Sequence, residues 1–217
     1  MRLLSISILA LFLVLGCKRD QPQPIDLGYD YLPMTIGASI RYAVDSTVYN
    51  DFTQSDTTYS FTIIETVVDT FSDADGRLNY RIERSKRFAD TGSYVLQKSM
   101  AVYFEPTRAG RLEDNAHTVI LAFPPDAGNS WNGNAYNDRG KENFEIISAH
   151  KSATVNGTTF DSVLTVEQYK DTTNFIEKRY RQERFAKNLG IISIEYIDIR
   201  TKLNGDSGVH YVKQILN

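Results

Sequence analysis

The feature that most constrains the fold is an alternation of apolar and polar residues with a period of two, repeated along most of the chain. Residues 39–49 place Ile40, Tyr42 and Val44 on one face, and residues 77–88 alternate in the same way. Successive side chains of a β-strand point to opposite faces of a sheet, so this period is typical of half-buried antiparallel strands. The sequence therefore predicts a mainly β domain.

Turn residues separate the predicted strands. The sequence SDADG divides strand 57–71 from strand 77–88, and Asn156-Gly157, a strong hairpin signal, divides strand 144–155 from strand 158–169. Further strands are expected at 93–106, 117–125, 174–186, 191–200 and 208–216. Residues 174–186 also fit one face of a helix, but the alternation resumes directly at Ile191, which favours a strand.

Eight to ten strands joined by short turns predict an up-and-down antiparallel meander with few short helices. A long twisted meander must curl to cover its inner face, which gives a half-barrel or a closed barrel.

The N-terminus has the pattern of an export signal. Arg2 is followed by an apolar stretch from Ile6 to Leu15, which is shorter than the roughly 20 residues that span a bilayer as a helix. Val14-Leu15-Gly16-Cys17 resembles the lipobox of bacterial lipoproteins, in which the cysteine receives acyl chains such as palmitate. We therefore expect a signal peptide over 1–16, lipidation of Cys17, a flexible tether over 17–28 and a single β domain over 29–217. The acyl chains would hold the protein to a membrane.

Charge and histidine placement exclude several classes of function. The net charge of −3 and the absence of a basic stripe argue against binding to nucleic acid. His117, His150 and His210 are isolated, without the spacing of a zinc site or a nucleophile motif. Asp73-Ala74-Asp75-Gly76 lacks the later ligands of a calcium loop and reads as a hairpin turn. We expect no catalytic residues, no metal and no cofactor, and hence no enzyme.

Residues 121–144 form the one segment whose composition shifts sharply, with many asparagines and glycines around the only tryptophan. Trp131, Asn132, Asn134 and Tyr136 could bind a ligand such as a glycan, since an aromatic ring stacks on a sugar while amides hydrogen-bond its hydroxyls. The alternative is that Trp131 plugs the end of the barrel and the polar residues only form turns.

Asp precedes Ser or Thr seven times in the chain. Around Ser46, Thr57, Ser162 and Thr172 the sequence resembles the acceptor pattern for O-glycosylation of exported proteins in Bacteroidota. Turns at strand ends favour the same dipeptides, so both interpretations stand.

Two longer segments, FPPDAGNSWNGNAYN and ERFAKNLGIISIEYIDI, resemble those of an uncharacterised Bacteroidota lipoprotein family. The second segment is also similar to a turn and strand of LolA/LolB-like periplasmic β domains. This resemblance implies a LolA-like or lipocalin-like sheet curved around an apolar groove that can accept acyl chains.

These observations together predict a lipid-anchored lipoprotein of the cell outer membrane. Lys18-Arg19 precede the single acid Asp20, which favours the periplasmic face. The expected function is a non-catalytic binding or accessory module for an apolar or acyl ligand, which requires a cavity lined by aliphatic side chains with few charges. A structural envelope protein is an alternative, and so is a glycan-contacting protein, which requires a solvent-exposed Trp131.

Overall fold

The computed structural model describes residues 26–88 and 92–216, so the signal peptide, Cys17 and most of the tether lie outside the described residues. These residues contain a short 3-10 turn, η1 (Tyr29–Tyr31), and twelve strands. The strands are β1 (Ser39–Asn50), β2 (Ser55–Ser72), β3 (Leu78–Arg87), β4 (Val95–Glu105), β5 (Arg108–Glu113), β6 (Ala116–Ala122), β7 (Ser130–Asn132), β8 (Asn143–Val155), β9 (Thr158–Asp171), β10 (Glu177–Ala186), β11 (Gly190–Lys202) and β12 (Gly205–Ile215). None of the helical residues in this part of the chain forms a segment long and apolar enough to cross a membrane.

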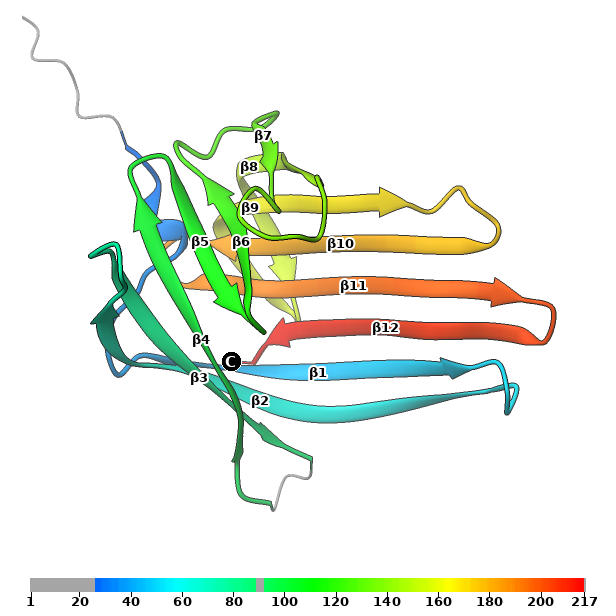
Figure 1. Ribbon diagram of the computed structural model, residues 1–217. Helices are drawn as coiled ribbons and strands as arrows, with labels where there is room; N and C mark the ends of the chain where they lie inside the picture. The colour runs from blue at the N-terminus through cyan, green and yellow to red at the C-terminus, as the bar shows by residue number, and fades with distance from the viewer. Residues whose placement is uncertain (1–25, 89–91, 217) are drawn as a thin grey trace, which may run out of the picture.

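All twelve strands belong to one antiparallel sheet, in the order β6-β5-β4-β3-β2-β1-β12-β11-β10-β9-β8-β7. The sheet consists of two meanders, β1–β6 and β7–β12, that are joined where the first and last strands pair (Figure 1). The free edges of the two meanders meet at a seam, where the backbone N–H of Val119 donates to the carbonyl of Gly133 at 2.8 Å. The curled meander predicted from the sequence is confirmed as a nearly closed barrel.

The predicted hairpins are confirmed, and their turns have the expected backbone conformations. Asn156 and Gly157 both have positive φ, at 47° and 79°, as a two-residue hairpin loop requires. In the turn between β2 and β3, Asp73 Oδ1 accepts hydrogen bonds from the backbone N–H groups of Asp75 and Arg77. Residues 177–186 form strand β10, so the strand interpretation of this segment was right.

The number of strands was underestimated, because β5 and β7 were not predicted. β5 has the sequence RAGRLE, which lacks an apolar alternation, yet Ala109, Gly110 and Arg111 are all buried. A Cβ atom added at Gly110 would lie only 2.2 Å from the ring of Tyr103, its partner on β4, so the tyrosine ring occupies the place of the missing side chain. β7 has only three residues, which is too short for any periodicity to appear.

The interior is divided into two hydrophobic clusters. The larger one packs around η1, whose Tyr31 is fully buried with its hydroxyl 2.7 Å from Nδ1 of His150 and 2.5 Å from Oγ of Ser162. The smaller one lies around Tyr42, Ile63 and Ile192. Tyr31 ties the incoming chain to β8 and β9, so η1 closes one end of the barrel.

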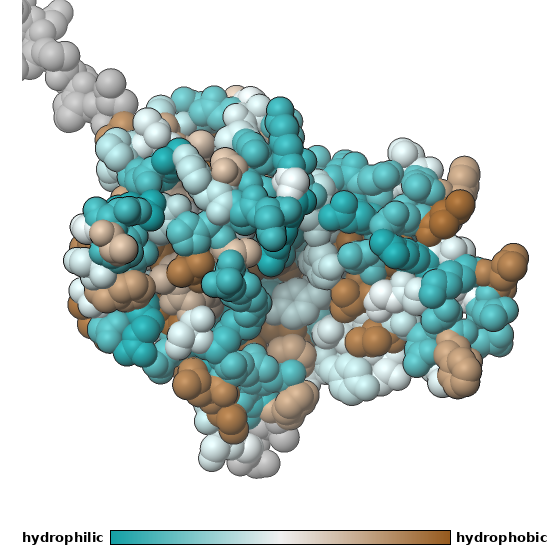
Figure 2. Space-filling view, viewed as in Figure 1, coloured by the Kyte–Doolittle hydropathy of each residue, from teal (hydrophilic) through white to brown (hydrophobic). Residues whose placement is uncertain are grey.

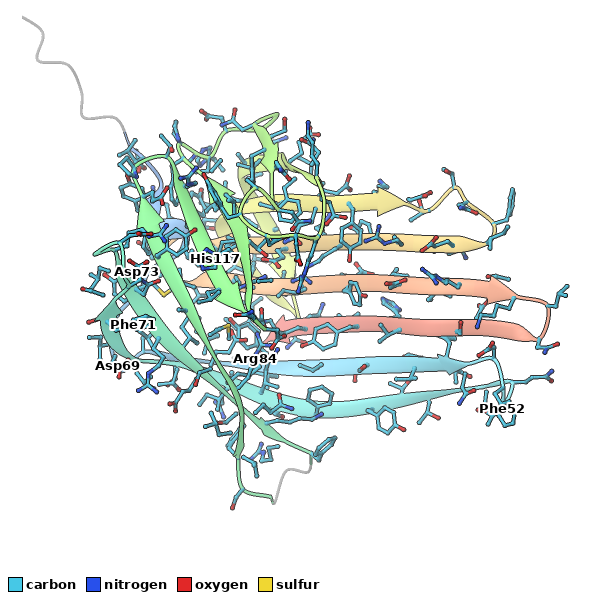
Figure 3. The ribbon with its side chains drawn as sticks, in the orientation of Figure 1. Phe52, Asp69, Phe71, Asp73, Arg84 and His117 are labelled. Carbon is cyan, nitrogen blue, oxygen red and sulfur yellow. The ribbon has the colours of Figure 1, made fainter. Side chains whose placement is uncertain are left out.

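Strands β1, β2 and β9–β12 are long and extend together away from η1 (Figure 1). Their connecting turns carry exposed apolar side chains at Phe52, Phe175 and Leu203, and Figure 3 labels Phe52 at the tip of the β1–β2 hairpin. Elsewhere the visible surface is a mixture of hydrophilic areas and smaller hydrophobic patches (Figure 2).

Candidate functional site

Charged side chains meet inside the barrel, where a simple β-barrel would hold apolar residues. Three of them are almost completely buried: Arg111 on β5 is 7% exposed, Glu183 on β10 is 0% exposed and Lys213 on β12 is 1% exposed. Their charged neighbours are Glu65 on β2, Arg84 on β3, Glu113 on β5 and Arg181 on β10. We call these seven residues the ion-pair layer; Figure 3 labels Arg84.

One branch of the ion-pair layer is centred on Glu65. Its Oε1 atom lies 2.6 Å from Nη2 of Arg84 and 3.1 Å from Nζ of Lys213. The ammonium group of Lys213 also lies 4.0 Å from the centre of the Tyr42 ring, in cation–π geometry. This branch therefore links β2, β3, β12 and β1.

The second branch crosses the barrel between the two meanders. Nη2 of Arg111 donates to Oε1 of Glu183 at 3.2 Å, and Nη2 of Arg181 donates to the same oxygen at 2.8 Å. Glu113 connects the branches, because its carboxylate lies 3.1 Å from Arg84 and 3.4 Å from Arg111. Burial of so many charges is tolerated because each has an oppositely charged partner.

The pKa values follow from this pairing. Burial disfavours the charged form of Glu183, but the charges of Arg111 and Arg181 outweigh that effect and hold its pKa at about 2. Burial likewise opposes ionisation of Glu113, and Arg111 and Arg84 lower its pKa to about 2. For Lys213 burial dominates, so its pKa lies below the ordinary value despite the attraction of Glu65. The carboxylates of the layer are thus firmly ionised at neutral pH.

Two cavities share the ion-pair layer as a common wall, since Arg84, Arg111 and Lys213 line both. The smaller has a volume of about 230 Å³ and lies toward η1. Apart from the shared charges and Glu65, aliphatic and methionine side chains dominate its wall, among them Leu32, Met34, Val67, Ile82, Met100, Ile120 and Ile191. We call this cavity the apolar chamber.

The larger cavity has a volume of about 640 Å³, and we call it the polar cleft. Its wall combines charged residues with tyrosines and amides, including Tyr169, Tyr196, Tyr211, Gln97 and Gln168. The expectation of an interior with few charges therefore does not describe the polar cleft. The same expectation holds for the aliphatic part of the apolar chamber but not for the wall that this chamber shares with the ion-pair layer.

The Trp131 segment forms the seam of the barrel. Nε1 of Trp131 donates to the carbonyl of Val119 at 2.8 Å, and the indole packs edge-on against Phe144. Oδ1 of Asn132 accepts from the backbone N–H groups of Asn134 and Glu142, both at 3.1 Å. These contacts hold the half-buried indole in the seam of the barrel, whereas the glycan interpretation requires an exposed indole and the plug interpretation places it at the end of the barrel.

Asn134 and Tyr136, the other two residues of the predicted ligand group, differ in their exposure to solvent. Asn134 is buried and lines the polar cleft, and its Oδ1 accepts from Nδ2 of Asn137. Tyr136 is 48% exposed, with the guanidinium group of Arg108 lying 4.6 Å from its ring centre. The four residues therefore do not converge on one surface.

The remaining predicted residues are placed as follows. Thr57 and Thr172 are exposed, whereas Ser46 is half-buried in β1 and the hydroxyl of Ser162 contacts Tyr31. O-glycosylation at these four positions stays a prediction. Within residues 26–88 and 92–216 no three His, Cys, Asp or Glu side chains are grouped as metal ligands.

Comparisons with known proteins give only distant structural matches. No protein-family model matches the chain, and no curated protein matches it. One similar solved structure is described as an exported protein with a YmcC-like fold from Bacteroides fragilis; it is 11% identical, with a TM-score of 0.44 over 86% of this chain and 98% of that one. Another, described as a lipoprotein from Parabacteroides distasonis, is 13% identical, with a TM-score of 0.44 over 89% of this chain and 98% of that one. The similarity to LolA/LolB-like domains stays a prediction.

Proposed function

We propose that the protein is a lipid-anchored, non-catalytic binding module of the cell envelope, and that the apolar chamber takes an acyl ligand. The observation that carries this proposal is the apolar chamber itself, an open cavity with an aliphatic wall inside a well-packed barrel. Small-molecule sites are typically concave and mostly apolar, and this cavity of about 230 Å³ has both properties.

The chemistry of the wall selects the class of ligand. Val67, Ile82 and Met100 offer apolar surface to a hydrocarbon chain, while Arg84, Arg111 and Lys213 stand at the shared wall. A carboxylate at the end of the chain would lie near these cations, as in an unesterified fatty acid. The proposed role is binding, which the apolar wall with its cations at one side supports.

Binding of straight-chain carboxylates tests this function. Affinity is expected to rise from butyrate to decanoate by about 0.8 kcal/mol for each methylene group that enters the chamber, and to stop rising once the chamber is full. Isothermal titration calorimetry on the purified β domain with its tether would measure this series. An affinity that does not depend on chain length would overturn the proposal.

A pair of matched variants locates the site. Ala38 is exposed and lines the mouth of the chamber, so Ala38→Trp should obstruct entry and weaken decanoate binding about tenfold or more. Ala74 is exposed in the turn between β2 and β3, so Ala74→Trp adds the same bulk away from the chamber and should leave binding unchanged. Equal losses in both variants would place the ligand elsewhere.

The anchor is tested on the full-length protein in its native membranes. The intact mass is expected to correspond to a chain that starts at Cys17 and carries acyl groups, and Cys17→Ala should remove this added mass and release the protein from the membrane. Further increments of the mass of a hexose would support O-glycosylation. A soluble, unacylated native protein would rule out the anchor but leave the chamber experiment valid.

A further inference from the structure

The polar cleft has more positive than negative charge in its wall. Its cationic side chains are Arg84, Arg111, Arg139, Lys141, Arg179, Arg181 and Lys213, and its carboxylates are Glu113, Asp114 and Glu142. Two more carboxylates do not line the cleft but pair with its cations: Glu65 contacts Arg84, and Glu183 contacts Arg111. When both are counted, the cleft still has a formal excess of two positive charges, seven against five.

Each carboxylate in the wall of the polar cleft forms an ion pair with a lysine or an arginine. Glu113 contacts Arg84, Arg111 and Lys98, while Asp114 contacts Lys98 at 2.6 Å. Glu142 lies 3.5 Å from Arg179. Among the described parts of the chain, neither Arg139 nor Lys141 has a carboxylate within 4 Å of its charged group. Both belong to the loop between β7 and β8, so two unpaired cations stand at the edge of the cleft.

Two buried hydrogen-bond donors of the cleft lack acceptors. Gln168 is only 3% exposed and lines the cleft, yet its Nε2 has no hydrogen-bond partner among the described residues. Nε of Arg181, on the neighbouring strand β10, is likewise buried with no partner in this part of the chain. A buried donor without an acceptor costs about 1–3 kcal/mol, so both donors would gain from an oxygen atom bound in the cleft.

Tyrosines complete the wall and remain neutral hydroxyl donors. Burial raises the pKa of Tyr211 to about 12, and it also raises that of Tyr169. The ring of Tyr169 carries the guanidinium group of Arg179 at 4.6 Å from its centre, which holds that cation over the cleft. The volume of about 640 Å³ lies within the usual range of small-molecule sites.

We propose that the polar cleft is a second binding site, separate from the apolar chamber, for a small organic anion bearing at least two phosphate or carboxylate groups. Arg139 and Arg181 would contact the charged oxygens, since guanidinium groups pair with both kinds of oxyanion in two-point geometry, and the ammonium group of Lys141 would add a further positive charge. Nε2 of Gln168 would donate to a further oxygen at the base of the cleft.

Calorimetry with two probes tests this site and identifies its anion. Pyrophosphate represents the phosphate class and citrate the carboxylate class, each titrated at low ionic strength because exposed charges are screened by salt. Saturable 1:1 binding of either probe supports the site. The probe that binds more tightly shows whether the natural ligand carries phosphate or carboxylate groups. If neither probe binds with a dissociation constant below about 1 mM, which corresponds to −4.1 kcal/mol, the proposal is wrong.

Variants separate this site from general electrostatic attraction. The double variant Arg139→Ala/Lys141→Ala removes two cations that make no ion pair with any described residue, so the fold should persist while affinity falls about tenfold. Lys151→Ala/Lys178→Ala removes the same charge from exposed positions outside the cleft and should leave affinity within about twofold. Equal losses in the two double variants would show that the probe follows net charge alone and would overturn the site.

Gln168→Leu provides a readout at the base of the cleft. It removes the unpartnered donor at nearly constant volume, so thermal stability should hold or rise while the affinity for the bound probe drops several-fold. Ala38→Trp should not change binding of the probe, because Ala38 lines only the apolar chamber. Loss of pyrophosphate or citrate binding in Ala38→Trp would merge the two sites into one and contradict the proposal.

Discussion

Replacement of Glu183 by glutamine is expected to lower the free energy of unfolding by about 3–5 kcal/mol. Glu183 is fully buried, and its Oε1 atom is the acceptor for both Arg111 and Arg181. The amide keeps the size of the side chain but removes the negative charge, which leaves Arg111 buried with a weaker set of partners. Urea denaturation followed by circular dichroism would measure the change.

Glu177→Gln on the same strand serves as the control. Glu177 pairs with the exposed Arg200 at 3.3 Å near the outer end of β10, where water screens the interaction. The expected loss there is at most about 1 kcal/mol. A loss of similar size in both variants would mean that the ion-pair layer does not depend on burial in the way that the structure indicates.

Acid is expected to destabilise the protein strongly between about pH 4.5 and pH 2. The pKa values of Glu113 and Glu183 are about 2 in the folded protein, against 4.5 as the ordinary value. Because the folded values are the lower ones, the stabilisation is complete above the unfolded pKa and is lost as the pH falls through this window. Each carboxylate accounts for about 3 kcal/mol, although two groups that share Arg111 will not add independently.

Urea midpoints measured at half-unit pH steps would follow this loss. The Glu183→Gln variant should show a shallower decline below pH 4.5, because one of the carboxylates with a lowered pKa no longer titrates. A wild-type stability that stays constant down to pH 3 would contradict the low pKa values of this pair.

Much of the fold could be predicted from local sequence. The period-two alternation located ten of the twelve strands, and Asn156-Gly157 fixed a hairpin, because both signals arise within a few neighbouring residues. Strand β5 could not be predicted, because its alternation of apolar and polar residues is interrupted by a glycine that Tyr103 covers and by an arginine that faces the interior. The role of Trp131 depends on which two strand edges meet in space, which no local pattern reveals.

The ion-pair layer left a signal in the sequence that was overlooked. Glu65 lies two residues from both Ile63 and Val67, Glu183 lies two residues before Phe185, and Lys213 lies two residues before Ile215. Each charge thus occupies the face of its strand that points into the barrel, and a charge there marks a functional or paired position. The partners could not be predicted, since Arg111 and Glu183 are 72 residues apart and meet only when the sheet curls.

The ladder between β1 and β12 makes folding depend on the last residues of the chain. Tyr42 pairs with Ile215 and Tyr49 with Gly208, so the first and last strands must find each other across almost the whole domain. Forming this ladder slows folding, because the entropy of closing a long loop is lost before its contacts form. A chain cut short before Gly205 would expose β1 and β11 as bare strand edges, which template aggregation. Strand β12 therefore protects the edges of both β1 and β11 from pairing with other molecules.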